Sequence, residues 1–283
     1  MIVRVGVPEP NGHLVDVAHH NALPVLISAG ALWDKARGRF GPPGLMVWRC
    51  RDVALDSAGF TAMKHWGGYP WTVDQYVDAV NLGRSGVRDD RGELPIPWTW
   101  WSQMDLCCEP EIAGDAATVR ARVEGTAELL AECRAEVDRW RWEGDHELAY
   151  PMPVLQGWHP DDYRRSIDLA DAVLGGDWPD LVGVGSVCRR QLGGPAGLWR
   201  VLDAIEGALP SHVKLHLFGV KSEALEQVGE RVASVDSMAW DLAARLNKGG
   251  KPSSVVARGE AMLAWAQRQG QRRPGPQISL WGG

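Results

Sequence analysis

Two short stretches decide the fold: Leu215-His-Leu-Phe-Gly-Val-Lys221 and Ser234-Val-Asp-Ser-Met-Ala-Trp240. The first indicates a buried strand that ends in a glycine turn. The second indicates an apolar strand that stops at Asp236 and continues as a helix. A strand that ends at a carboxylate is typical of a barrel enzyme that presents a catalytic acid. Taken alone, Asp236 also has a simpler interpretation as the N-cap of the helix that follows it.

Strands and helices alternate outward from these stretches, over about residues 23–246. Apolar runs predict strands at 23–28, 45–48, 53–55, 98–104, 152–155, 181–184, 213–217 and 232–235, after a short strand at 2–7. Helical spacing is found at 73–82, 116–142, 161–174, 195–209, 236–246 and 256–269, and 83–97 is expected to be an exposed loop. Such alternation implies a parallel sheet. Seven or eight units within ~250 residues favour a (β/α)8 barrel of the TIM type.

We expect a single α/β domain over residues 1–283. Its core would span about 23–246, followed by a C-terminal helix and tail at 250–283. The first helix is not opened by Gly-x-Gly-x-x-Gly, so the fingerprint of a dinucleotide-binding fold is missing.

Composition excludes several classes of protein. The chain has 283 residues, 45% hydrophobic and 23% charged, as in ordinary globular proteins. A net charge of −6 argues against a protein that coats nucleic acid non-specifically. The five cysteines show no paired spacing, which argues against a disulfide framework or a zinc ribbon. No apolar run approaches the ~20 residues that a membrane helix needs, so we expect a cytoplasmic protein without a membrane partner.

Polar residues or glycines follow six of the predicted strands. They are Asp56 and Ser57, Asp105 and Cys107, Gln156 and Gly157, Gly185 and Ser186, Phe218 and Gly219, and Asp236. In a barrel these strand ends share one face, where such enzymes place their sites. Two carboxylates there can act as nucleophile and general acid/base. A third carboxylate with an amide can bind the donor and acceptor edge of a planar ligand.

Several of these residues, and three others, also have a structural interpretation. Asp56 is a candidate for a turn or cap, and Cys107 for a small buried hydrophobe. Gln156-Gly157 would only close a turn, and His216 would be a satisfied core residue or a support for another side chain. Arg189 and Arg190 are candidate phosphate contacts or part of a solvated face.

At this point the sequence resembles the tRNA-guanine transglycosylase superfamily. Asp56-Ser-Ala-Gly-Phe60 resembles the Asp-Ser-Gly-Gly-Tyr segment of those enzymes, and Met104-Asp-Leu-Cys107 resembles Phe-Asp-Glu-Cys. The remaining matches follow in the same order: Val154-Leu-Gln-Gly157, Gly183-Val-Gly-Ser-Val187, His216-Leu-Phe-Gly219 and Val235-Asp-Ser-Met-Ala-Trp240. Six short matches in order, over roughly 23–246, make the resemblance specific.

The resemblance implies an enzyme that exchanges guanine for a 7-deazaguanine base without a cofactor. Carried over by position, Asp236 would be the nucleophile on the sugar C1′ and Asp56 the general acid/base. The base would be held by Asp105, Cys107, Gln156 and the backbone of Gly185 and Ser186, with Phe218 and Gly219 against it. Ser57 and Gly157 complete the expected substrate-binding set.

The departures from the family pattern point to DNA. The tRNA enzymes carry zinc-binding cysteines after the nucleophile, whereas here no cysteine follows Cys188. A barrel without the zinc ribbon and without a metal is similar to the phage and bacterial DNA 7-deazaguanine (DpdA-type) enzymes. Their substrates would be DNA and a free base such as 7-cyano-7-deazaguanine (preQ0). Trp66, Trp98, Trp100 and Trp101 are then candidates for stacking on a flipped base.

Three alternatives remain open from the sequence. The same chemistry could act on tRNA, or the barrel could bind a purine or nucleic acid as a non-catalytic subunit. An unrelated barrel hydrolase would need a metal. Because the net charge is −6, a homodimer or an accessory protein is a further candidate for supplying the DNA-binding surface.

Overall fold

The computed structural model describes residues 1–44, 46–84, 87–89, 92–94, 98–144, 147–188, 190–220, 224, 227–246 and 254–271. Within them, one parallel sheet has eight strands, in the order β8-β5-β2-β1-β12-β11-β10-β9. Their bounds are β1 (Ile2–Val7), β2 (Val25–Ser28), β5 (Val53–Asp56), β8 (Trp98–Trp101), β9 (Val154–Leu155), β10 (Leu181–Val184), β11 (Lys214–Leu217) and β12 (Ser234–Ser237).

The two ends of this sheet meet and close a barrel. Ser102, just after β8, forms a parallel bridge with Met152, just before β9. The Met152 N–H donates to the Trp101 carbonyl at 2.8 Å, and Gln103 N–H donates to the Met152 carbonyl at 3.1 Å. The strands therefore follow one another around the barrel in chain order, which confirms the predicted (β/α)8 fold. Because β1 pairs with β12 and β2, the barrel begins at Ile2 and not near residue 23.

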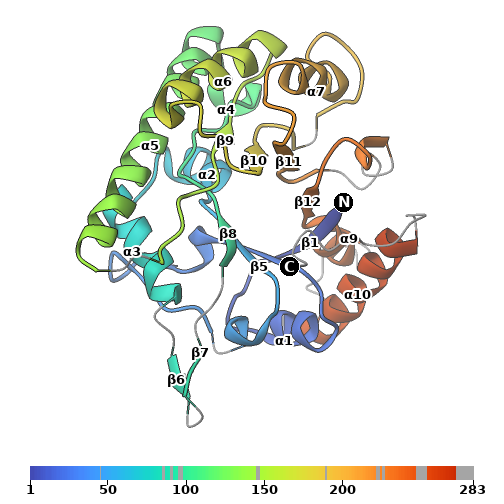
Figure 1. The fold of residues 1–283 in the computed structure, drawn as a ribbon. Helices are drawn as coiled ribbons and strands as arrows, with labels where there is room; N and C mark the ends of the chain where they lie inside the picture. The colour runs from blue at the N-terminus through green and yellow to red at the C-terminus, as the bar shows by residue number, and fades with distance from the viewer. Residues whose placement is uncertain are drawn as a thin grey trace.

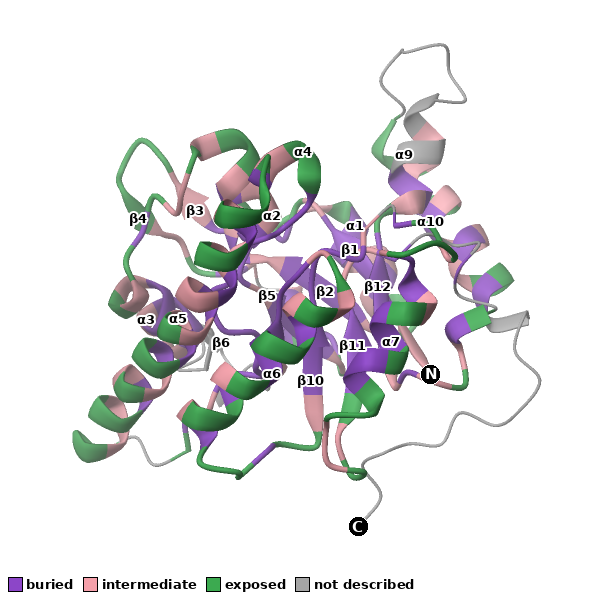
Figure 2. Ribbon diagram, turned by 90° about the horizontal axis from the view of Figure 1, so that it is seen from above, coloured by how far each residue is buried: buried purple, intermediate pink, exposed green. Residues whose placement is uncertain are grey.

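Helices surround the barrel on its outside (Figure 1). The longer ones are α1 (His13–His20), α3 (Val73–Arg84), α5 (Ala116–Trp142), α6 (Pro160–Leu174), α7 (Leu198–Glu206), α9 (Ala239–Leu246) and α10 (Val255–Gln271). Figure 2 shows the strands buried at the centre and the exposed residues on the outer faces of the helices. The short helices α2 (Gly59–Thr61) and α4 (Pro110–Ala113) lie with α9 at the carboxyl ends of the strands.

Local sequence explains how the helices form. Helix α5 occupies the predicted range, and the Asp115 side chain caps it by accepting from Thr118 N–H at 2.7 Å. Val123, Leu130 and Val137 recur at helical spacing on its buried face. The apolar strands in turn are buried on both faces, as a parallel barrel requires.

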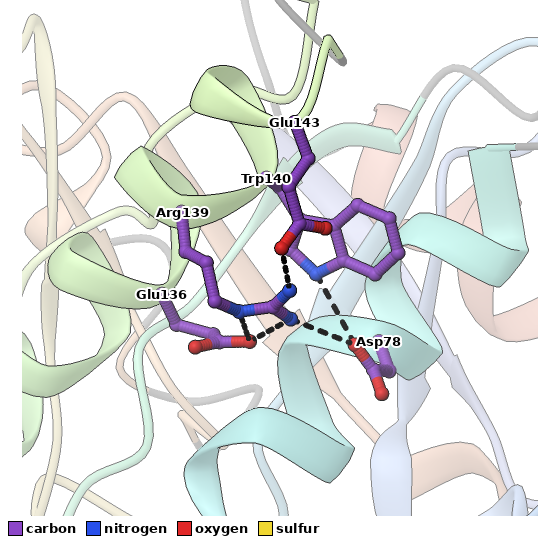
Figure 3. Close-up of polar contacts among 5 residues, drawn as sticks. All are labelled: Asp78, Glu136, Arg139, Trp140 and Glu143. Carbon is purple, nitrogen blue, oxygen red and sulfur yellow. Dashed lines mark hydrogen bonds and ion pairs between the residues drawn. The ribbon is translucent and has the colours of Figure 1, made fainter.

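An ion-pair cluster joins α5 to α3 at the surface (Figure 3). Arg139 pairs with Glu136 and Glu143 of its own helix and lies 3.7 Å from Asp78 of α3. The Trp140 indole N–H donates to the Asp78 carboxylate at 3.1 Å. Exposed pairs of this kind contribute little to stability. The apolar faces therefore hold these two helices together.

Two local predictions differ from the structure. The expected strand at 45–48 is wrong, because Val47–Arg49 forms a 3₁₀ turn, η2, that buries Val47 and Trp48; residue 45 lies outside the described residues. The expected loop at 83–97 contains an antiparallel hairpin of β6 (Val87–Asp89) and β7 (Gly92–Leu94) in its described part. A second hairpin, β3 (Trp33–Asp34) with β4 (Arg39–Phe40), follows β2.

Candidate active site

A cavity of about 570 Å³ opens at the carboxyl ends of the strands. Its walls combine carboxylates from three separate stretches of the chain with an apolar surface. The carboxylates are Asp56, Asp105, Glu109, Asp236 and Asp241; the apolar residues include Leu26, Phe60, Phe218 and Val220. Such a cavity suits a flat ligand that is apolar on its faces and carries hydrogen-bond donors on its edge.

Asp236 is buried within β12, next to Arg4 of β1 in the strand register. Its Oδ1 accepts the N–H of Gly219 at 2.9 Å and lies 3.4 Å from Nε2 of His216. The N-cap interpretation is wrong, because α9 begins three residues later and the Ser237 hydroxyl accepts from Ala239 N–H at its start. The carboxylate is therefore held at the cavity wall by the strand itself.

His216 supports Asp236 from below the cavity. The ring is fully buried, which lowers the pKa of His216 and keeps it neutral. A carboxylate can only accept, so the proton belongs on Nε2 beside Asp236. Nδ1 then accepts from the hydroxyl of Ser234 at 2.8 Å. The expectation that His216 supports another side chain is consistent with this geometry.

Asp56 ends β5 on the same cavity. Its Oδ2 accepts the N–H of Ala58 at 3.2 Å, and Ala58 adopts a left-handed φ of 71° to turn the chain there. Burial raises the pKa of Asp56 to about 7, and the negative charges of Asp105 and Asp236 add to the shift. Asp56 is thus both a turn residue and a carboxyl group that can hold a proton near neutral pH.

Asp105 anchors a chain of side chains along the cavity floor. Its Oδ1 accepts from the Ser57 hydroxyl at 2.5 Å, and its Oδ2 accepts from the amide N–H of Gln156. Burial raises the pKa of Asp105 to about 6, although both hydrogen bonds oppose the shift. Each carboxylate oxygen keeps a further lone pair that can accept from a ligand.

Ser186 continues this chain beyond Gln156. Its hydroxyl lies 2.6 Å from Gln156 Oε1 and 3.0 Å from Glu109 Oε2, and it accepts from Cys108 N–H at 2.6 Å. Its φ of 53° is left-handed and orients the hydroxyl toward these partners. A Cβ at Gly185 would lie 2.1 Å from Gln156 Nε2, so a larger residue there would displace the Gln156 amide from this chain. Asp105, Gln156, Ser186 and Glu109 form one connected series, which we call the base-reading chain.

A family model described as "DpdA: DeoxyPurine in DNA protein A" matches residues 37–275, which is most of the chain. The chain belongs to this family. A comparison with curated proteins found none that matches. Membership in the DpdA family implies an enzyme of the transglycosylase type that modifies deoxypurines in DNA.

Most residues predicted from the sequence do line the cavity of this DpdA-family protein. Those that line it are Asp56, Asp105, Cys107, Gln156, Gly185, Ser186, Phe218, Gly219 and Asp236. Ser57 is not among the residues that line the cavity but lies behind Asp105, to which its hydroxyl donates. Gly157 lies against helix α6, since a Cβ there would be 2.7 Å from the Asp162 Cβ. Cys107 is buried, which raises the pKa of its thiol.

Arg190 does not face outward as a phosphate contact would. It is buried, and its guanidinium donates to the carbonyls of Ser186, Trp158, Ala196 and Gly157. These bonds tie the loop after β10 to the loop after β9, so Arg190 positions Ser186 from within the protein. The other expected contact, Arg189, lies outside the described residues.

The tryptophans weighed as stacking candidates are mostly packing residues. Trp98 donates its indole N–H to Val80 O, and Trp101 is buried and donates to Ala149 O. Trp100 lies under the cavity, with its ring 4.7 Å from that of His216. Trp66 is half-buried beside Gly30, at the rim.

The sequence prediction missed Glu109 and Phe60. Glu109 is buried in the cavity wall, and burial raises its pKa. The available signal was its position four residues after Asp105, in the same strand-end loop and directly before Pro110, the first residue of α4. In the part of the chain that the structure describes, no group of three or more His, Cys, Asp or Glu side chains could hold a metal ion. No described helix is long and apolar enough to cross a membrane.

We expect the change Ser186→Gly to weaken binding of the free base about fivefold, because a lost hydrogen bond costs about 1 kcal/mol. Gln156 would lose the partner that fixes its amide. Glycine accepts the left-handed φ, so the fold is retained. Calorimetric titration with guanine measures the effect. Unchanged affinity would mean that the base-reading chain does not extend to Ser186.

Asp56→Asn is expected to stabilise the protein at pH 8. Because the folded protein holds the Asp56 proton up to a pKa of about 7, against an ordinary value of 3.8, ionisation destabilises the fold as the pH rises through this window. This destabilisation is absent below pH 3.8 and complete above about pH 7. It amounts to about 2–4 kcal/mol, which asparagine avoids.

Melting temperatures at pH 4 and pH 8 test this prediction. The variant should melt higher than the wild type at pH 8 and equally at pH 4. Asp168→Asn, at an exposed position of α6, is the matched control and should show no such difference. A variant that was less stable at pH 8 would contradict the raised pKa.

Proposed function

We propose that this protein replaces guanine in DNA with a 7-deazaguanine base such as preQ0, through a covalent bond between Asp236 and the sugar. The main support is that Asp56 and Asp236 line one cavity together with the base-reading chain. The two carboxylates have different surroundings, which suits different roles. Family membership supports DNA as the substrate.

In the first half of the reaction, a carboxylate oxygen of Asp236 attacks C1′ of a flipped deoxyguanosine. The C1′–N9 bond breaks, and its electron pair goes to N9 of guanine. Asp56 is protonated near neutral pH and gives its proton to the departing base. The enzyme then holds the DNA sugar as an ester, and guanine leaves as a neutral molecule.

In the second half, the incoming 7-deazaguanine enters the same cavity. Asp56, now ionised, takes the N9 proton of this base. N9 then attacks C1′, and the bond from C1′ to Asp236 breaks. Atoms, protons and oxidation state balance over the exchange, and Asp56 ends as it began. The polymer stays intact throughout, because only the glycosidic bond is cleaved.

The base-reading chain fits guanine and its 7-deaza relatives. The N1–H and 2-amino groups of guanine are donors, and the carboxylate of Asp105 has acceptor positions left for both. The purine O6 is an acceptor and would face Gln156 or the backbone beside Gly185. Position 7 is a nitrogen in guanine and a carbon that carries a cyano group in preQ0, so the cavity would have to accept either group at that edge of the base.

Mass spectrometry of nucleosides tests the proposal. Protein incubated with guanine-containing DNA and preQ0 should yield the deoxynucleoside of preQ0 and release guanine. A parallel reaction with tRNA should yield no modified ribonucleoside. Exchange into tRNA alone would move the substrate to RNA, and exchange into neither would leave only a base-binding role.

A further inference from the structure

Three exposed cations gather at one side of the cavity mouth. Lys35 and Arg39 flank the turn of the β3–β4 hairpin, and Lys64 lies on the short π-helical turn η3 (Ala62–Trp66). We propose that these residues, the hairpin surface, bind the phosphate backbone of the DNA strand whose base enters the cavity. This inference rests on the proposed function. The hairpin surface supplies the DNA contact that the buried Arg190 cannot make.

Contacts tie this surface to the cavity. The Lys64 ammonium lies 5.1 Å from the ring centre of Phe60, which lines the cavity. The Lys35 ammonium lies 4.7 Å from the ring centre of Trp66. Trp66 lies close to Gly30, where an added Cβ would come within 3.3 Å of both Trp66 and Ala58, two residues after Asp56. Figure 2 shows β3 and β4 beside α2, on the side where the strands end.

The cations of the hairpin surface have no ion-pair partner among the residues that the structure describes. Among the described residues, Lys35, Arg39 and Lys64 form no ion pair with a carboxylate, whereas Arg37 between them pairs with Asp34 at 3.1 Å. The cavity itself is lined by carboxylates. Phosphates are thus repelled from the cavity and attracted to its rim, while the uncharged base can enter.

This distribution answers the problem raised by the net charge of −6. Affinity for DNA comes largely from cations that replace counterions at phosphates, and a local cluster is sufficient for it. A flipped nucleotide leaves its phosphates at the mouth of the pocket that takes its base. Lys64 is placed beside the wall of that pocket, and Lys35 and Arg39 are placed farther out on the hairpin to meet neighbouring phosphates.

The test compares two triple variants with equal loss of charge. The hairpin variant carries Lys35→Gln, Arg39→Gln and Lys64→Gln. The control variant carries Arg49→Gln, Arg51→Gln and Lys214→Gln, which are exposed residues before or at the amino ends of strands β5 and β11. Fluorescence anisotropy measures binding to a guanine-containing DNA at several salt concentrations. Calorimetry with guanine reports whether the cavity is intact.

We expect the hairpin variant to bind DNA on the order of 100-fold more weakly at about 0.1 M salt. The slope of log K against log salt should fall by about 2 to 3, because each lost phosphate contact lowers it by about 0.7 to 0.9. Guanine affinity should be unchanged, and the control variant should bind DNA like the wild type. Single substitutions, each with its own share of the slope, keep the test decisive if the triple change disturbs the fold.

Equal DNA affinity in the hairpin and control variants would overturn the inference. A wild type that binds DNA through this surface without exchanging bases would refute the proposed function but retain the hairpin surface. If the wild type exchanges bases and the hairpin variant binds DNA as well as the control variant, the proposed function is retained and the hairpin surface is refuted. If the hairpin variant lost affinity for tRNA but kept its affinity for DNA, the assignment of this surface to DNA would also be overturned.

Discussion

Asp236→Asn is expected to reduce guanine exchange by at least about four orders of magnitude, the scale seen when a nucleophile is removed. Asparagine keeps the size of the side chain and an oxygen that can accept from Gly219 N–H. It cannot form the ester with C1′, so neither half of the exchange can occur through the covalent route. The rate of labelled guanine uptake into DNA measures the loss.

Binding measurements distinguish this outcome from misfolding. The asparagine variant should still bind guanine, because the base-reading chain is separate from Asp236, and it should still bind DNA. His216→Gln is a useful companion, since it removes the support of Asp236 but not the nucleophile. We expect it to lower kcat without changing base affinity. Exchange at more than a few per cent of the wild-type rate by Asp236→Asn would contradict the mechanism.

Asp56→Asn is expected to lower exchange by about 10²–10⁴-fold, the usual contribution of a general acid or base. In the wild type, kcat/KM for DNA should fall as the pH rises through about 7, because the first half-reaction needs the protonated carboxyl group. The variant has no proton to lose there, so its residual rate should be flat across that range.

This variant separates catalysis from stability. The same substitution that removes activity should stabilise the protein at pH 8. Asparagine carries no charge, whereas the ionised Asp56 carboxylate is desolvated and lies near the negative charges of Asp105 and Asp236. A variant that was both inactive and unstable would indicate a structural role. A wild-type pH profile with no decline near 7 would contradict the assignment of Asp56 as the acid.

The barrel could be predicted because its signal is repeated. Six of the strands are short apolar runs followed by a polar residue or glycine, and parallel strands in chain order bring those ends together. Helix α5 was predicted to the residue, because its length and apolar spacing leave little ambiguity. The run at 45–48 was misassigned, since a short apolar segment is equally compatible with a strand and with the buried turn that η2 forms.

Side-chain direction explains the other differences. Asp236 lies inside β12 and not at the start of the helix, because β12 extends two residues further than the apolar run suggested. Arg190 has the charge of a phosphate contact, but its guanidinium points inward to carbonyls of the loop after β9, which are distant in the sequence. Glu109 was missed for the same reason, as its partner Ser186 is on another strand end. Sequence spacing predicts which residues lie at the strand ends, but it does not predict which side chains or carbonyls they contact.

The covalent intermediate is the central claim, and one measurement tests it directly. The protein is incubated with guanine-containing DNA without a replacement base, denatured and analysed by intact mass and peptide mapping. We predict a protein–DNA adduct in which the peptide containing Asp236 carries an abasic deoxyribose, and its disappearance when guanine or preQ0 is added before denaturation. Active exchange without any adduct, or an adduct on another residue, would contradict the account.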